Sequence, residues 1–234
     1  LIEEQNRKQK FIMGMSHDLR TPIAIIKGYI EAINDGIVSS PDEIEKSLEL
    51  IHIKSTQLEE MINTLINFMK MDSYEILKDV KEESITQIIK DFAKNSFVMA
   101  NVFKRKIITN IDLPKDIVIE VNKMLVQRAF ENLFSNAIRY TKDNDSIFLN
   151  AYILQEKNEI IFEIKDTGIG IKKNDLNYIF DMFYRGTNSR REEGMGIGLS
   201  VVKNVITTYG WKIDVSSEEN KGTTFIIHIP FAEN

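Results

Sequence analysis

The chain has 234 residues, of which 43% are hydrophobic and 28% charged, a composition typical of an ordinary soluble globular protein. Its net charge of −5 comes without a basic block, so we expect no nucleic-acid binding. Cysteine is absent, which excludes disulfides, thiolate metal sites and cysteine nucleophiles. No apolar run approaches the ~18 residues of a membrane span, and the chain begins within a polar helical pattern. We therefore expect a piece of a longer protein, with any sensor or membrane anchor upstream.

The first 76 residues have the pattern of two helices. The first is predicted to end near Asn34, before Asp35-Gly36, and the second to begin at Ser40 or Pro41. Apolar residues of the second helix follow one another at alternating spacings of four and three, which is a heptad seam: Ile44, Leu48, Ile51, Ser55, Leu58, Ile62, Leu65 and Met69. A single antiparallel hairpin cannot bury this much apolar surface. The hairpin could pack on the rest of the chain, or two hairpins could meet as a four-helix bundle. We predict the second arrangement, which is a homodimer.

Residues 77–234 are predicted to form a second domain of α+β class. The patterns predict helices at 85–103, 123–140 and 199–209, and strands at 106–111, 117–121, 147–154, 160–165, 211–216 and 223–230. Strands with interspersed helices indicate an α/β sandwich, in which helices cover one face of a single sheet.

One histidine of the first helix lies opposite its apolar face. With Met15 taken as zero, the residues of the apolar stripe lie between roughly −40° and +80°: Phe11, Met15, Leu19, Pro22, Ile23, Ile26, Ile30 and Ile33. His17 lies at about 200°, with Thr21 about 40° away on the same face and Asp18 beside it in sequence. An exposed imidazole beside a carboxylate can act as a nucleophile. An ordinary surface histidine would look the same.

Three further motifs lie in the second half, and each has an ordinary structural explanation as well. Asn132 and Asn136 share a helix face and could ligate a hard cation, or simply face solvent. The sequence D-T-G-I-G-I at 166–171 follows a strand and could accept from an amine, or form a plain β-turn. G-M-G-I-G-L at 194–199 leads into a helix and could cradle phosphate. Between the last two lies an aromatic and arginine-rich stretch at 179–193 that could close over a nucleotide as a lid, or be a surface loop.

The order of these motifs is more specific than any one of them. The chain resembles the sensor histidine kinases of two-component systems, and the resemblance rests on S-H-D-L-R-T-P (16–22), N-x-x-x-N (132–136), D-x-G-x-G (166–170), F-x-x-F-Y-R (180–185) and G-x-G-x-G-L (194–199). It implies a dimerisation and histidine-phosphotransfer domain at 1–76 and, at 77–234, an ATP-binding domain of the type shared with gyrase B, Hsp90 and MutL.

The resemblance implies a role for each matching residue. His17 is expected to accept phosphate from ATP, Asp18 to take or orient the ring proton, and Thr21 to help place water for dephosphorylating the partner. Asn136 is expected to bind Mg²⁺, and Asp166 to read the adenine. The remaining nucleotide contacts are expected from Asn132, Arg139, Tyr140, Gly168, Gly170, Phe183, Arg185, Gly194, Gly196, Gly198, Leu199, and Thr223 or Thr224.

Departures from the commonest family pattern remove no obligatory group. Asp18 stands where Glu is more usual, and Met195 stands where a small hydroxyl residue is frequent. Asn122 is interpreted as a helix cap. His52 and His228 are predicted to be structural.

The resemblance implies ATP-dependent autophosphorylation of His17 and phosphoryl transfer to an aspartate of a response regulator receiver domain, with phosphatase activity toward that regulator. Two alternatives remain. A clamp ATPase of the same nucleotide-binding class would need a water-activating glutamate, for which Glu131 is the nearest residue. A non-catalytic dimeric scaffold would not need His17, Asn136 or the glycines.

Overall fold

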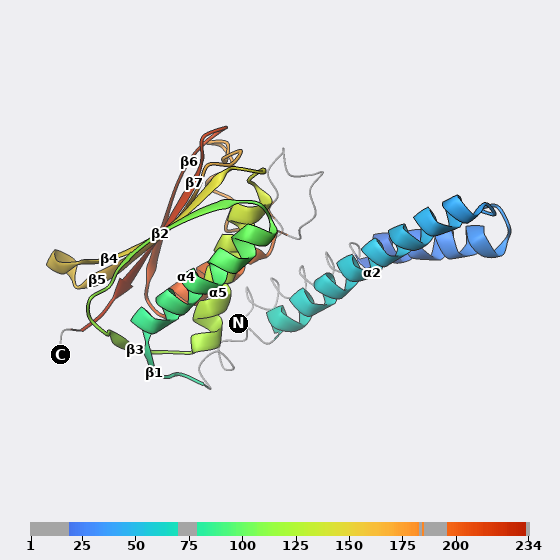
Figure 1. The fold of residues 1–234 in the computed structure, drawn as a ribbon. Coiled ribbons are helices and arrows are strands. Elements are labelled where there is room, and N and C mark those ends of the chain that lie inside the picture. Colours follow the sequence, from blue (N-terminus) through green and yellow to red (C-terminus); the bar gives the residue numbers. More distant parts are fainter. Residues whose placement is uncertain (1–18, 70–78, 183, 185–195, 233–234) are drawn as a thin grey trace. The chain divides into compact units, whose positions relative to one another are not determined.

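A computed structural model describes residues 19–69, 79–182, 184 and 196–232 of the chain. Two compact units are present, Leu1–Asp72 and Ser73–Asn234, and each is described by itself (Figure 1). The predicted domain boundary at residues 76 and 77 falls within 70–78, outside the described residues, so it stays a prediction.

The first unit is an antiparallel helical hairpin, as predicted. Residues 19–34 are helical, and α2 (Pro41–Met69) follows after a short turn (Figure 1). Gly36 takes φ +71 in that turn, and the N–H of Val38 donates to Ala32 O at 3.0 Å. Ser40 caps α2, because its hydroxyl accepts from the Glu43 N–H at 3.3 Å, and the same hydroxyl donates to the Glu43 carboxylate at 2.8 Å.

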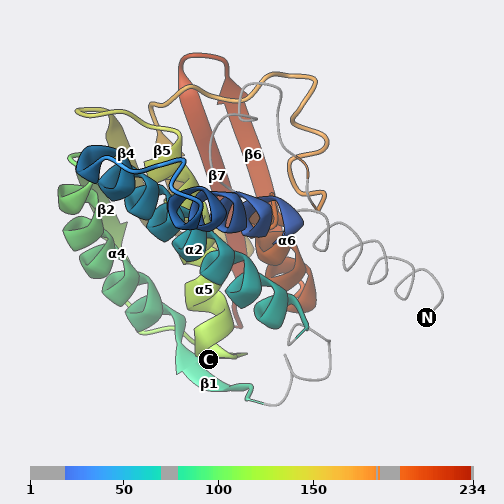
Figure 2. The ribbon, with the colours of Figure 1, turned by 90° about the vertical axis from the view of Figure 1, so that its right-hand side faces the viewer.

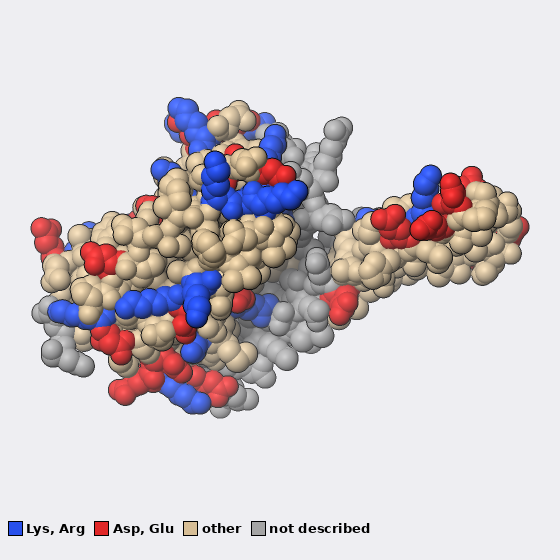
Figure 3. All heavy atoms as spheres, viewed as in Figure 1, with Lys and Arg blue, Asp and Glu red and all other residues tan. Residues whose placement is uncertain are grey.

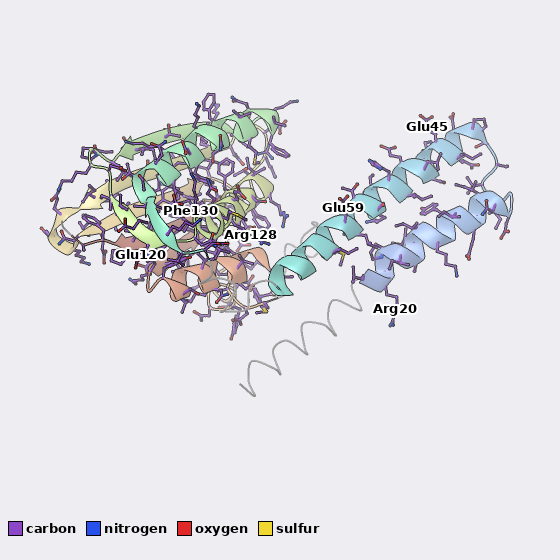
Figure 4. The ribbon with its side chains drawn as sticks, turned by 90° about the horizontal axis from the view of Figure 1, so that it is seen from below. Arg20, Glu45, Glu59, Glu120, Arg128 and Phe130 are labelled. Atoms are coloured by element: carbon purple, nitrogen blue, oxygen red, sulfur yellow. The ribbon has the colours of Figure 1, made fainter. Side chains whose placement is uncertain are left out.

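The hairpin leaves much of its apolar surface uncovered in the single chain. Ile23 is 51% exposed, Ile30 45% and the seam residue Leu48 54%. Charged residues also lie outward, and Figure 4 shows Glu45 and Glu59 along α2 and Arg20 on the other helix. A helix pair that exposes both apolar and charged faces has more hydrophobic surface than it can bury within itself.

The second unit is a five-stranded sheet with helices packed on one face (Figure 2). Its strands, in the order in which they lie side by side, are β2 (Lys106–Asp112), β4 (Ser146–Leu154), β5 (Glu159–Asp166), β7 (Gly222–Pro230) and β6 (Lys212–Glu218). The β2–β4 pair is parallel and the other pairs are antiparallel. The covering helices are α4 (Ile85–Val102), α5 (Lys123–Arg139) and α6 (Gly198–Thr208). The predicted α+β class and the one-sided helix layer are thus confirmed.

Two strands lie outside this sheet. β1 (Lys81–Ser84) pairs antiparallel with β3 (Val118–Val121) in a separate two-stranded sheet. β3 was expected from its β-branched residues, whereas β1 was not, because the sequence K-E-E-S has no apolar alternation. β1 forms because β3 offers it backbone hydrogen bonds, which local sequence does not reveal.

An aromatic cluster joins the helices to the sheet. Phe92 of α4 lies 5.5 Å from Phe130 and 6.0 Å from Phe134 of α5, measured between ring centroids. Phe130, labelled in Figure 4, lies 4.6 Å from Phe162 of β5. Edge-to-face and offset ring pairs contribute about 0.5–1.5 kcal/mol each beyond their burial. The cluster therefore fixes α5 against β5, the two elements that carry the polar residues described next.

Two predicted details are also present. The Asn122 side chain caps α5 by accepting from the N–H groups of Met124 and Leu125 at 3.0 and 3.3 Å. His228 lies in β7 between Glu159 and Asp214, with ring nitrogens 3.1 and 3.0 Å from their carboxylates, as expected of a structural histidine. On the face drawn in Figure 3, basic and acidic side chains are interspersed, which agrees with the modest net charge of −5.

Candidate functional site

A pocket opens within the second unit where the end of β5 meets α5, the start of α6 and β7. Its lining is apolar with a few polar groups, and comprises Asn136, Tyr140, Asp166, Ile169, Gly170, Ile171, Lys172, Asp175, Ile179, Tyr184, Leu199, Thr223 and Phe225. Six of these were predicted from the sequence: Asn136, Tyr140, Asp166, Gly170, Leu199 and Thr223. Concave apolar pockets with a few convergent polar groups are typical of ligand sites.

Asp166 is the polar centre of this pocket. It is the last residue of β5 and is only 6% exposed. Its Oδ1 accepts the Gly168 N–H at 2.8 Å, and the Thr223 N–H also donates to the carboxylate. Burial raises the pKa of Asp166 to about 6, and the nearby Asp145 carboxylate adds to the rise, while the two N–H donors oppose it. The buried carboxylate thus remains a hydrogen-bond acceptor at neutral pH, where few water molecules compete for it.

Three glycines let backbone segments pack closely against one another at Asp166 and the turn that follows it. A Cβ at Gly168 would lie 2.1 Å from Tyr140 O, and one at Gly170 would lie 2.1 Å from Glu218 O. A Cβ at Gly222 would lie 1.9 Å from Asp166 O, and Gly222 has φ +108. Gly222 was missed from the sequence, although its place between a turn and a strand was a usable signal. Side chains at these positions would force the turn away from Asp166.

Backbone hydrogen bonds fix the 168–171 turn from both sides. The Ile169 N–H donates to Tyr140 O at 3.1 Å, and the Asn220 N–H donates to Ile169 O at 2.7 Å. Ile171 N–H donates to the Ser217 hydroxyl at 2.8 Å. The turn is therefore held between the end of α5 and the β6–β7 hairpin.

Arg105 fixes the end of α5 that carries Tyr140. Its side chain is 13% exposed, and its Nε and Nη2 donate to the hydroxyl and carbonyl oxygens of Thr141 at 3.0 and 2.6 Å. Its Nη1 donates to Asp143 at 2.8 Å. The Thr141 hydroxyl in turn donates to Ala137 O at 2.7 Å, one of the free carbonyls at the helix end. The positive guanidinium also complements the negative end of the helix dipole.

The predicted asparagine pair lies on the side of α5 that faces the start of α6. Asn136 lines the pocket, and the Asn132 Oδ1 lies 3.6 Å from where a Gly198 Cβ would be. Within the described part of the chain, no three His, Cys, Asp or Glu side chains cluster to hold a metal ion. One amide oxygen nevertheless suits Mg²⁺ that takes its other ligands from phosphate and water. Arg139 is exposed and is not among the lining residues.

The remaining predicted residues divide into described and undescribed ones. Thr21 is helical and exposed. Thr223 and Thr224 are neighbours in β7, so their side chains lie on opposite faces of the sheet. Thr223 lines the pocket, so it is the residue of the predicted pair that fits the site. Gly196 has φ +66. Outside the described residues lie His17, Asp18, Phe183, Arg185 and Gly194.

Seven lining residues were not predicted. Ile169, Ile171, Ile179 and Phe225 form apolar walls, and the strand alternation around Phe225 was a usable signal for it. No helical or strand periodicity in the sequence indicates that Asp175 and Tyr184 line the pocket. The Tyr184 hydroxyl donates to Asp175 at 2.7 Å, and this hydrogen bond raises the pKa of Tyr184. The last of the seven is Lys172.

The fold and the pocket define a two-unit protein with a helical hairpin and an α/β domain that carries a ligand-type pocket. Residues 7–74 match the family described as His Kinase A (phospho-acceptor) domain, and residues 121–233 match the family described as Histidine kinase-, DNA gyrase B-, and HSP90-like ATPase. The chain belongs to the sensor histidine kinases.

Relatives and solved structures agree with this assignment. The chain is 36% identical over 228 residues to the sensor protein SrrB of Staphylococcus aureus, which covers 97% of this chain and 38% of SrrB. The histidine kinase AdeS of Acinetobacter baumannii has a similar fold, with a TM-score of 0.65, 20% identity and coverage of 93% of this chain and 98% of AdeS. The histidine kinase ThkA, solved in complex with the response regulator protein TrrA, gives a TM-score of 0.76 at 19% identity over 98% of this chain and 64% of that one.

Within residues 19–69, 79–182 and 196–232, every helix is too short or too polar to cross a lipid bilayer.

The close approach at Gly170 predicts a large difference between two alanine substitutions. Gly170 and Gly210 both have φ +66, but a Cβ at Gly210 meets nothing within 4 Å. Gly210→Ala should cost about 1 kcal/mol through its backbone conformation alone. Gly170→Ala must also displace the Glu218 carbonyl, so we expect it to cost at least about 3 kcal/mol in urea unfolding. Equal costs would contradict the close packing of the turn.

The raised pKa of Asp166 predicts a stability change with pH. An unfolded Asp loses its proton near pH 3.8 and the folded one near pH 6, so between these values the folded chain binds more protons. The free energy of unfolding relative to Asp166→Asn should therefore fall as pH rises from about 4 to 6, by roughly 2–3 kcal/mol. Denaturant unfolding of the nucleotide-free chain measures this, with Asp181→Asn as the matched exposed control. A pH-independent difference would show that Asp166 is not buried as described.

Proposed function

We propose that the chain is an ATP-dependent protein-histidine kinase that transfers the γ-phosphoryl group of ATP to His17. The observation that carries this proposal is the pocket that is lined by both the buried Asp166 and Asn136 of α5, whose side-chain amide could bind a cation. The membership of the chain in the sensor histidine kinase family supports it further.

In this proposal the pocket binds ATP by its base. The Asp166 carboxylate accepts from the exocyclic amine of adenine, and the apolar side chains of Ile169 and Ile179 exclude water from the ring. Asn136 holds Mg²⁺, which neutralises charge on the phosphates. The start of α6 supports the phosphates, because its N-cap residue Ile197 has no polar side chain to bind the free N–H groups of the first turn.

The chemical step is assigned to His17 and Asp18, which lie outside the described residues. A neutral ring nitrogen of His17 attacks the γ-phosphorus, so that an N–P bond forms as the bond to the leaving ADP oxygen breaks. Asp18 takes or orients the proton on the other ring nitrogen, which keeps the attacking nitrogen basic. Thr21, which is exposed and lies four residues after His17 in sequence, serves a separate reaction by placing water for dephosphorylation of the response regulator.

The acceptor of the phosphoryl group is an aspartate of a response regulator receiver domain. Support comes from ThkA, whose structure was solved in complex with a response regulator. The chain spans 38% of the length of SrrB, and we propose that it is the cytoplasmic portion of a membrane-anchored sensor. Nucleic acid is not a partner in this proposal.

The clamp ATPase alternative has less support. Its water-activating glutamate would have to reach the pocket, but Glu131 is exposed and is not among the lining residues. A non-catalytic scaffold would not need the buried carboxylate of Asp166 or the close-packed glycines around it.

Autophosphorylation with γ-labelled ATP and Mg²⁺ tests the kinase proposal. The unsubstituted chain should acquire acid-labile, base-stable label, and His17→Gln should lose it at least about 1000-fold because the nucleophile is gone. His52→Gln, which removes an exposed histidine of α2, is the matched control and should keep the label. Label that persists in His17→Gln would overturn the assignment.

The exposed apolar seam supports a homodimer, as predicted from the heptads. Leu48 is 54% exposed and lies in the seam, whereas Leu50 is 37% exposed and lies about 200° around α2. Leu48→Glu should place a charge in the bundle core and yield monomer in light scattering at micromolar concentration. Leu50→Glu should remain dimeric. A dimer that survives both substitutions, or dissociates with both, would contradict the seam as the interface.

A further inference from the structure

A shared hydrogen-bond network connects the β6–β7 hairpin to the pocket. Ser217 of β6 lies directly opposite Thr223 of β7, and the two hydroxyl oxygens are 3.0 Å apart. Thr223 is 7% exposed and lines the pocket, whereas Ser217 lies behind it and is not a lining residue. Ser217 therefore acts on any bound molecule only through Thr223.

The proton of the Ser217 hydroxyl is already committed. Ser217 Oγ lies 2.8 Å from Gly222 O, and a carbonyl oxygen can only accept a hydrogen bond. The Ser217 hydroxyl must therefore donate its proton to Gly222 O, because otherwise the lone pairs of the two oxygens would face each other. Ser217 Oγ also receives the Ile171 N–H at 2.8 Å. A hydroxyl has a single proton, so toward Thr223 the Ser217 oxygen can only accept.

The proton of Thr223 is fixed as a consequence. Because Ser217 accepts, Thr223 must donate its hydroxyl proton to Ser217, and its remaining lone pairs are left for the pocket. Asp166, whose ionised carboxylate can likewise only accept, lies on the neighbouring strand and receives the Thr223 N–H. The side-chain oxygens of Asp166 and Thr223 thus both present acceptors to a bound molecule.

We propose that Ser217 is a specificity-positioning residue, which holds the Thr223 hydroxyl as an acceptor and so favours a 6-aminopurine over a 6-oxopurine. The inference rests on the proposed binding of ATP with its base at Asp166. An exocyclic amine donates to both acceptors, whereas the oxygen of a 6-oxopurine faces their lone pairs. Without Ser217, the Thr223 hydroxyl is free to rotate and donate to that oxygen.

The test compares ATP with ITP, which differs in carrying a 6-oxo group in place of the amine. Dissociation constants are measured with Mg²⁺ at pH 8, where Asp166 is ionised, by displacement of a fluorescent ADP analogue. Ser217→Ala should reduce the preference for ATP over ITP about tenfold, the size of one misdirected hydrogen bond. Ser217→Thr keeps the hydroxyl and should retain the preference. Ser216→Ala, on the opposite and exposed face of β6, is the matched control.

A double substitution separates positioning from a merely structural role. In a Thr223→Val background, Ser217→Ala should leave the ATP-to-ITP ratio unchanged, because the hydroxyl it acts through is absent. The inference about Ser217 would be overturned if Ser217→Ala weakened the binding of ATP and ITP equally, or changed the ATP-to-ITP ratio by the same factor in both backgrounds. The proposal that the chain binds ATP would still stand. Failure of the unsubstituted chain to bind ATP would instead overturn the proposed function, and the inference with it.

Discussion

The buried carboxylate of Asp166 constrains how the backbone segments around the pocket of the second unit pack together. A carboxylate that is only 6% exposed must be compensated, and two backbone N–H groups from different segments do so only partly, since its pKa is still raised to about 6. Those segments reach the carboxylate because Gly168 and Gly222 carry no Cβ, and Gly170 allows the turn to pack against Glu218. The incompletely compensated carboxylate therefore lowers the stability of the folded chain. Such a cost is typical of functional sites, where a buried charged group is positioned to bind a ligand.

The structure around Asp166 shows how distant parts of the chain hold one turn in place. On one side, Arg105 binds Thr141 and so fixes the end of α5, where Tyr140 O receives the Ile169 N–H. On the other side, Ser217 receives the Ile171 N–H and orders the Thr223 hydroxyl. The helical hairpin differs, because its apolar residues remain exposed in one chain, and we propose that a second copy covers them.

The sequence predicts the elements of both units well, because helical periodicity, strand alternation and the Asn122 cap are local signals. It also predicts Asp166, Asn136 and the turn glycines, since the motif spacing is carried by contiguous residues. It does not predict β1, which forms a strand only by pairing with β3. It also does not predict Gly222, which must be glycine because a Cβ there would clash with Asp166 O. The roles of Arg105 and Ser217 depend on hydrogen bonds to residues that only the folded chain brings near, such as Thr141 and Ile171.

The central claim is that Asp166 is a buried acceptor for the amine of ATP. The most direct measurement is the ¹³C NMR titration of the Asp166 carboxyl carbon, without nucleotide and with saturating ATP and Mg²⁺. We expect a pKa of about 6 in the free chain and a lower pKa in the complex, because a donated hydrogen bond stabilises the ionised form. A pKa near 3.8 in the free chain, or one that ATP leaves unchanged, would contradict it.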